Sequence, residues 1–203
     1  MKRKLIIIGT GGHGKVVLDI AKRSGYSDIS FLDDNPPGET WCGYPVLGMS
    51  LDARQYPEAI FAVAVGNANV RKRIQECLSA QGLQIATLIH PNAVVAEDTV
   101  IGDGSVIVAG AVINPGAVLG KGVIVNTCAS VDHDCQIGDF VHIAVGANIA
   151  GTVVIGESTW IGAGAVVSNN LSVTAGCMIG AGAVVVNDIE EAGTYIGVPA
   201  RKK

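Results

Sequence analysis

One period dominates the second half of the chain. From Val95 every sixth residue is aliphatic, through sixteen consecutive positions that end at Val185. Mostly small residues stand two positions before them, as at Ala93, Ala111 and Ala183. Because residues i and i−2 of a strand share one face, each six-residue unit presents one large and one small side chain inward.

A longer period of 18 residues is superimposed on this frame. Glycine recurs at this spacing after the aliphatic position, and such glycines mark turns or close packing: Gly102, Gly120, Gly138, Gly156; Gly162, Gly180; and Gly146, Gly164, Gly182. Three hexads therefore make one coil, which predicts a parallel β-solenoid with three flat sides. Residues 95–185 supply about five coils, or roughly 24 Å at ~4.8 Å per layer. A sandwich is the alternative, but its turns do not keep a fixed frame. General strand-crossover chirality favours right-handed connections, and periodicity alone does not decide the hand.

The first ~90 residues follow a different pattern. We expect buried strands at residues 5–8, 29–32, 60–65 and 85–89. Amphipathic helices alternate with them, one over residues 16–21 ending near Gly25, the other over 70–78, capped by Asn69 and stopped by Gly82. This alternation predicts a small α/β domain with a parallel sheet. We place a Rossmann-like domain at residues 1–90 and the solenoid, with a C-terminal tail, at 91–203.

Composition removes several classes of protein. The 203 residues are 49% hydrophobic and 16% charged, which excludes a disordered chain. A net charge of −4 leaves no electrostatic footprint for nucleic acid or an anionic membrane. The longest stretch without acidic or basic residues, 158–187, is too often interrupted by polar residues and glycine for a spanning helix. The four-residue apolar run after the basic start, Met1 to Lys4, is too short for a signal peptide.

The five cysteines form no C-x-x-C pair and no disulfide framework. Their odd number predicts a reducing, cytoplasmic setting in which they act as small buried residues.

A glycine-rich segment could hold a nucleotide. Gly9-Thr10-Gly11-Gly12-His13-Gly14 follows a predicted strand and precedes a helix, and Asp33-Asp34 comes about 20 residues later. Glycines let a phosphate approach the backbone, and the N–H groups of a helix N-terminus attract it. Gly66-Asn67 ends another parallel strand and is expected in the same crevice. The domain is too short for two mononucleotide-binding halves, which favours a single nucleotide or nucleotide sugar over NAD. A tight turn without any ligand is the alternative.

Two adjacent polar residues interrupt the solenoid pattern. His133 and Asp134 stand near a predicted corner, and His142 follows half a coil later. A histidine beside a carboxylate suits general base catalysis, although two solvated surface residues fit the spacing equally well. His13 either donates to a phosphate or caps its helix. Zinc sites need three or four ligands, and the solenoid offers only two histidines, so no metal is expected.

The motifs as a set resemble a known family. The hexad frame is similar to the hexapeptide-repeat acyltransferases, and I-I-I-G-T-G-G-H-G-K, F-L-D-D, V-G-N, I-H-P, V-N-T-C-A-S-V-D-H-D-C and I-G-V-P-A-R resemble one branch of it. That branch contains bacterial sugar acetyltransferases of the sialic-acid O-acetyltransferase type and the PglD-like enzymes, which acetylate a UDP-4-amino-4,6-dideoxy sugar on the way to bacillosamine. The resemblance implies a left-handed β-helix, a homotrimer with active sites between subunits, and acetyl-CoA as donor.

The resemblance also implies roles for individual residues. His133 matches the catalytic base and Asp134 the acid that raises its basicity, a position where relatives often have Glu. His142 matches a residue beside the acetyl-CoA thioester, and Gly151 a backbone N–H for the carbonyl oxygen. Ala163 and Ala181 match contacts to the pantetheine arm. The nucleotide-sugar pocket is matched by Gly11, Gly12, His13, Asp33, Asp34, Gly66 and Asn67.

Three functions follow as hypotheses. The first is N-acetylation of the 4-amino group of a nucleotide-linked, UDP-type sugar in bacterial glycan biosynthesis. The second is O-acetylation of a sialic-acid-like sugar, which is not nucleotide-linked in every case. The third is a nucleotide-binding scaffold without catalysis, against which the adjacent His133 and Asp134 argue.

Overall fold

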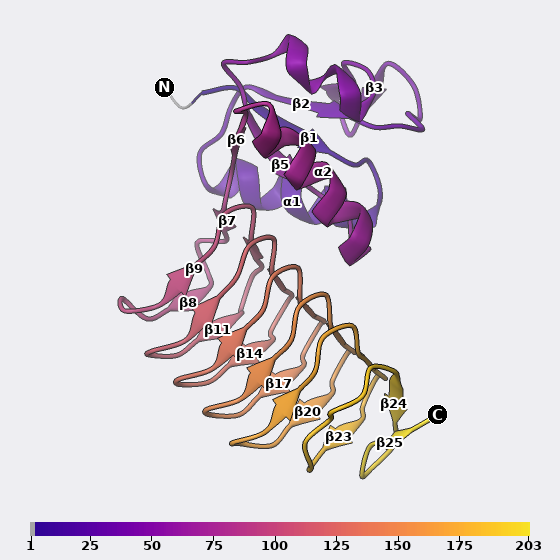
Figure 1. Cartoon of the computed structure of the whole chain (residues 1–203). Helices are drawn as coiled ribbons and strands as arrows, with labels where there is room; N and C mark the ends of the chain where they lie inside the picture. Colours follow the sequence, from indigo (N-terminus) through magenta and orange to yellow (C-terminus); the bar gives the residue numbers. More distant parts are fainter. Residues whose placement is uncertain (1–2) are drawn as a thin grey trace. The chain divides into compact units, whose positions relative to one another are not determined.

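The computed structural model describes residues 3–203; Met1 and Lys2, part of the basic start of the chain, lie outside the described residues. Contacts along the chain divide it into two compact units, Met1–Pro91 and Asn92–Lys203. Figure 1 shows a parallel sheet with helices in the first unit and a stack of coils in the second. The predicted fold class, an α/β domain followed by a hexapeptide-repeat β-helix, is confirmed.

The first unit is built on a four-stranded parallel sheet. Its strand order is β2-β1-β5-β6, with bounds Ile29–Leu32, Leu5–Ile8, Ile60–Val63 and Gln84–Ile85. The remaining elements are α1 (Gly12–Arg23), β3 (Thr40–Trp41), β4 (Tyr44–Pro45), the 3-10 helix η1 (Ser50–Gln55), α2 (Ala68–Ala80) and β7 (Leu88–Ile89). Every residue of β1 is buried, as a central parallel strand covered on both faces requires.

Three local predictions for this unit are wrong in detail. The cap of α2 is Asn67, not Asn69: Asn67 has extended backbone and its side chain accepts the Val70 N–H, whereas Asn69 lies within the helix. The strand expected at 60–65 ends at Val63. The strand expected at 85–89 is two short ones, β6 and β7, because the chain leaves the sheet after Ile85.

The second unit is a three-sided solenoid. One sheet runs β8-β11-β14-β17-β20-β23, a second β9-β12-β15-β18-β21, and the third contains β10, β13, β16, β19, β22, β24 and β25. The bounds are β8 Val94–Val95, β9 Val100–Ile101, β10 Val106–Ile107, β11 Val112–Ile113, β12 Val118–Leu119, β13 Ile124–Val125, β14 Ser130–Val131, β15 Gln136–Ile137, β16 His142–Ile143, β17 Asn148–Ile149, β18 Val154–Ile155, β19 Trp160–Ile161, β20 Val166–Val167, β21 Ser172–Val173, β22 Met178–Ile179, β23 Val184–Val185, β24 Thr194–Ile196 and β25 Arg201–Lys202. From β8 to β23 pairing is parallel with partners 18 residues apart, as in Val131 with Ile149, whereas β24 and β25 pair antiparallel.

From β8 to β23, each two-residue strand directs its second residue inward. In β18, Val154 is 42% exposed whereas Ile155 is 1% exposed and belongs to the core. The small inward positions include Ala111, Ala129 and Cys135. The alternation of one large and one small inward side chain is therefore confirmed.

The corners of the solenoid share a left-handed backbone conformation, and the glycine positions alone do not predict all of them. Every sixth residue from Gly104 to Gly182 has positive φ, including the non-glycine residues Cys128, Asp134 and Thr152. In the 18-residue series that starts at Gly102, the positions are glycine for a different reason. A Cβ on Gly156 would lie 2.7 Å from Ala175 Cα in the next coil, so these positions are small because the coils pack closely.

The cysteines depart from expectation. All five are free, but only Cys135 and Cys177 are buried, while Cys42, Cys77 and Cys128 are exposed. Cys128 is exposed because it occupies a corner rather than an inward position. Neither α1 nor α2, nor any other helix within residues 3–203, has the length and apolar character to cross a lipid bilayer.

Candidate active site

The corner between β14 and β15 carries a histidine–carboxylate pair. His133 Nδ1 lies 2.9 Å from Asp134 Oδ2, and the two side chains are 56% and 66% exposed. Asp134 has φ +59°, a conformation that aspartate tolerates better than most residues. The left-handed corner turns the Asp134 carboxylate back onto the imidazole and leaves Nε2 as the ring nitrogen without this partner.

Neighbouring coils hold this pair in place. The Asp134 N–H donates to Pro115 O at 3.1 Å, and the Thr152 N–H donates to His133 O at 2.8 Å. A Cβ on Gly151 would lie 2.6 Å from His133 Cε1, so the imidazole lies against the backbone of the next coil. Gly151 has no room for a side chain on this side because the His133 ring occupies that space.

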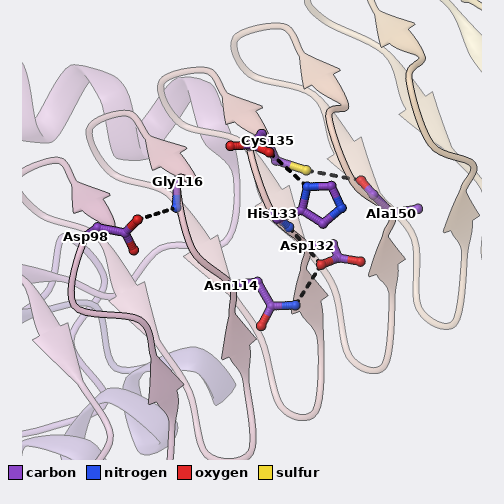
Figure 2. A network of polar contacts seen from close by, with 8 residues as sticks. Asp98, Asn114, Gly116, Asp132, His133, Cys135 and Ala150 are labelled. Carbon is purple, nitrogen blue, oxygen red and sulfur yellow. Dashed lines mark hydrogen bonds and ion pairs between the residues drawn. The ribbon is translucent and has the colours of Figure 1, made fainter.

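A second carboxylate supports the corner, and sequence reasoning did not assign it. Asp132 Oδ1 accepts the His133 N–H at 2.7 Å and also accepts Asn114 Nδ2 at 2.7 Å (Figure 2). Asn114 precedes Asp132 by one 18-residue coil. That spacing was the available signal, because residues 18 apart stack on each other.

These contacts set the charges of the site. The hydrogen bond to Asp134 raises the pKa of His133; desolvation opposes this shift, and the charges of Asp132 and Asp134 add to it. The hydrogen bond from Asn114, followed by that from the His133 N–H, lowers the pKa of Asp132. The imidazole is thus a stronger base than an isolated histidine.

His142 lies on another side of the coil. It is in β16, which belongs to a different sheet from β14, so one chain does not bring it together with His133. His142 is 6% exposed, its ring centroid lies 4.2 Å from that of Trp160, and its Nε2 lies 3.2 Å from Asn126 Nδ2.

Ala163 and Ala181 follow β19 and β22 of the sheet that contains His142. Both are exposed, they stand 18 residues apart, and glycine flanks each of them. The Gly182 N–H donates to Ala163 O at 2.8 Å, which ties the two corners together. The result is a row of small residues that presents main chain rather than side chains.

The glycines after β1 divide into two kinds. A Cβ on Gly9 would lie 2.8 Å from Ala64 O, and one on Gly14 would collide with Gly9 O and lie 3.3 Å from Trp41. Nothing lies within 4 Å of a Cβ on Gly11 or Gly12. The first pair is required by packing, whereas the second pair faces open space at the start of α1.

This difference predicts opposite results for two matched variants. Gly14→Ala should destabilise the first unit, because its Cβ meets backbone that cannot move aside. Gly12→Ala should leave stability unchanged or raise it by up to ~1 kcal/mol, yet weaken nucleotide binding if a phosphate approaches this turn. Thermal unfolding and nucleotide titration check the pair, and tight nucleotide binding by Gly12→Ala would contradict the assignment.

The two predicted acids differ in their surroundings. Asp33 Oδ2 accepts both the N–H and the hydroxyl of Thr10, each at 2.6 Å, and Asp33 Oδ1 accepts the Asn35 N–H. Partial burial raises the pKa of Asp33, but the hydrogen bonds from Thr10 and Asn35 outweigh it and leave the pKa below its usual value. Asp33 thus fastens the β1–α1 turn.

Asp34 lies beside a pocket. Its Oδ1 accepts the Ser50 N–H at 2.8 Å. The pocket, about 260 Å³, is lined by Asp34, Ser50, Leu51, Arg73, Ile74, Cys77, Leu78 and Gln81.

Gly66 and Asn67 follow β5, and a buried arginine that sequence reasoning missed holds the segment. Arg71 Nη1 donates to Val65 O at 2.9 Å and to Gly66 O at 2.8 Å. Burial, and secondarily the charge of Arg71, lowers the pKa of His13 to about 4, so His13 is neutral near pH 7. A single arginine within a helical sequence pattern gives no indication that its side chain is buried.

The described residues offer no cluster of metal ligands. Over residues 3–203, no three or more His, Cys, Asp and Glu side chains are grouped so as to hold a metal ion.

Fold and site define a hexapeptide-repeat transferase with a Rossmann-like domain and an exposed histidine–carboxylate pair. Residues 4–78 match the PglD N-terminal domain, and residues 86–115 match the family described as bacterial transferase hexapeptide (six repeats). The chain belongs to the hexapeptide-repeat acetyltransferases with a PglD-type N-terminal domain, as its sequence motifs predict.

Individual relatives support the membership of this chain in the family. The chain is 35% identical over 155 residues to GDP-perosamine N-acetyltransferase of Escherichia coli O157:H7, covering 73% of this chain and 70% of the relative. It is 38% identical over 108 residues to UDP-N-acetylbacillosamine N-acetyltransferase of Bacillus subtilis (strain 168), covering 51% and 50%. The solved acetyltransferase domain of PglB from Neisseria gonorrhoeae FA1090, in complex with acetyl coenzyme A, is 45% identical, covers 100% of both chains and has a TM-score of 0.96. The chain is accordingly an acetyltransferase.

Proposed function

We propose that this acetyltransferase moves an acetyl group from acetyl-CoA to the 4-amino group of a nucleotide-linked 4-amino-4,6-dideoxy sugar in bacterial glycan biosynthesis. The carrying observation is the exposed His133–Asp134 pair, whose hydrogen bond raises the basicity of the imidazole. Two relatives named as N-acetyltransferases of GDP- and UDP-linked amino sugars support the substrate class. We favour UDP, because the PglD-type domain and the bacillosamine-type relative agree, and we expect the reaction in the cytoplasm.

The mechanism assigned to these residues is direct transfer. His133 Nε2 takes a proton from the sugar amine as the amine nitrogen bonds to the thioester carbonyl carbon. The Gly151 N–H donates to the oxyanion that develops on the carbonyl oxygen. When the carbon–sulfur bond breaks, His133 returns the proton to the coenzyme A thiolate. Asp134 holds the tautomer and stabilises the imidazolium between these steps.

Acetyl-CoA binding is assigned to His142, Gly151, Ala163 and Ala181. His133 and His142 lie on different sides of one coil, so a single chain supplies only part of the site. A homotrimer of parallel solenoids would place the His133 corner of one subunit beside the His142 side of the next. Mixing His133→Ala subunits with Ala163→Trp subunits, whose donor row is blocked, should restore activity that neither has alone. Failure of re-formed mixed oligomers to regain activity would contradict a shared site.

The raised pKa of His133 predicts the pH dependence. The base must be neutral, so kcat/KM should rise with pH through an inflection above the usual histidine value of 6.5. Asp134→Asn removes the carboxylate that raises this pKa, so the inflection should move to lower pH while the plateau rate falls. A pH profile of initial rates checks both changes, with Asp19→Asn, distant in sequence and outside the pair, as a control that should move neither.

The substrate is tested with a panel of UDP-, GDP- and TDP-linked 4-amino sugars and acetyl-CoA, followed by thiol release and product mass. A ligand that binds only the native state also raises the melting temperature. N-acetylation of the UDP sugar is expected. Faster O-acetylation of a sialic-acid-like sugar would overturn the N-acetyl assignment, and binding without any transfer would favour a scaffold.

A further inference from the structure

Arg71 is a buried cation on α2. Its side chain is among the largest in the described chain that are fully buried, with 0% exposure. Arginine is almost never fully buried unless paired, because removing its charge from water costs several kcal/mol. Two carbonyl oxygens, those of Val65 and Gly66, accept hydrogen bonds from its Nη1. The charge of Arg71 is therefore kept in the interior at a cost in stability.

Arg71 lies at the carboxyl end of β5, beside the switch point of the sheet. In the order β2-β1-β5-β6, the chain goes from β1 outward to β2 on one side and from β5 outward to β6 on the other. Ligands of open α/β sheets bind outside the carboxyl ends of the strands at such a switch point. β1 is followed there by the open Gly11-Gly12 turn, and β5 is followed by the Gly66 segment that Arg71 holds.

The charge of Arg71 acts on a residue at the other side of this switch point. It contributes to the lowered pKa of His13, which lies at the start of α1, on the β1 side of the crevice. The first turn of α1 contains no acidic residue, although the Asp33 carboxylate accepts the Thr10 N–H just before the helix and offsets part of its positive end. The guanidinium from one side and the helix N-terminus from the other both favour an anion between β1 and β5.

We propose that Arg71 is a positioning residue for the diphosphate of the nucleotide substrate. It acts without touching the diphosphate, by fixing the Gly66 carbonyl and by adding a buried positive charge below the phosphate-binding turn. A charge in a low-dielectric interior is screened less than one on the surface, so its attraction persists over a greater distance. This inference rests on the proposed function, since it needs a nucleotide diphosphate in the first unit.

The test separates the charge from the hydrogen bond. Arg71→Gln keeps a donor for the carbonyls and removes the charge, whereas Arg71→Lys keeps the charge. Binding of UDP and uridine, and of GDP and guanosine, is measured by ligand-observed NMR. Arg71→Gln should weaken diphosphate binding by about tenfold and leave nucleoside binding unchanged, and Arg71→Lys should retain most of the diphosphate affinity. In turnover, Arg71→Gln should raise KM for the nucleotide sugar and leave kcat unchanged.

Gln75→Met is the matched control. Gln75 is 3% exposed and lies four residues further along α2, so its replacement also removes a buried polar group from this helix. It should leave the preference for diphosphate over nucleoside unchanged. Equal losses of UDP and uridine affinity in Arg71→Gln, or no loss at all, would overturn the inference. Wild-type protein that binds neither diphosphate would overturn the proposed function itself, and the inference with it.

Discussion

Replacing His133 with alanine should lower kcat by about 10²–10⁴-fold, the usual contribution of a positioned general base. Its Nδ1 is held by Asp134 at 2.9 Å, and the Asp134 carboxylate raises its pKa, so Nε2 is the basic atom offered to the substrate. Steady-state kinetics with acetyl-CoA and the amino sugar, both saturating, measure the loss. KM should change little, because the proton transfer belongs to the transition state.

Exposure of the His133 side chain makes this variant easy to interpret. With 56% of the side chain in solvent, its loss should leave the melting temperature and acetyl-CoA binding unchanged. Asp132→Asn is the informative companion, because it keeps an acceptor for the His133 N–H while removing a charge that helps raise the pKa of His133. It should lower the kcat/KM inflection with a much smaller loss of rate. Near-native turnover by His133→Ala would refute the base assignment.

Replacing Ile155 with alanine should destabilise the solenoid by about 2–5 kcal/mol, the cost of truncating a large core side chain. Ile155 is 1% exposed and contributes one large inward side chain to its coil. Collapse around the cavity is restricted, because β18 is paired with β15 on one side and β21 on the other. Chemical denaturation, followed through the unfolding transition of the second unit, measures the change in its free energy of unfolding.

Val154 supplies the control from the same strand. It precedes Ile155, points outward and is 42% exposed, so Val154→Ala should change stability by no more than about 0.5 kcal/mol. Equal effects of the two substitutions would contradict the inward and outward assignment. A loss in Val154→Ala that grows on dilution would instead indicate that this face is covered by another subunit.

The sequence predicted most of the solenoid, because a six-residue repeat leaves little choice of register. A shift by one residue would turn every large aliphatic side chain outward. The corners were predicted less well. Glycine marks close packing at Gly156 and a left-handed turn at Gly164, and these roles look alike in sequence. The left-handed corners at Cys128 and Asp134 carry no glycine at all.

The candidate site also has a part that the sequence predicted and a part that it did not. His133 and Asp134 are neighbours in the chain, so their interaction was foreseeable from residue type alone. Asn114 lies a full coil from Asp132, and only the stacking of coils brings the amide to the carboxylate. His142 stands on another side of its coil, a placement that depends on where each corner falls.

By itself, the sequence determined the repeat, the inward core, the division into two units and the histidine–carboxylate pair, because each depends on residues at short, regular spacings. The tertiary structure decided what surrounds that pair and what holds the segment after β5. The stacking of coils pairs Asn114 with Asp132, and the burial of Arg71 places its guanidinium on the carbonyls of Val65 and Gly66. Burial and hydrogen-bond geometry are properties of the assembled chain, so these roles became visible only in three dimensions.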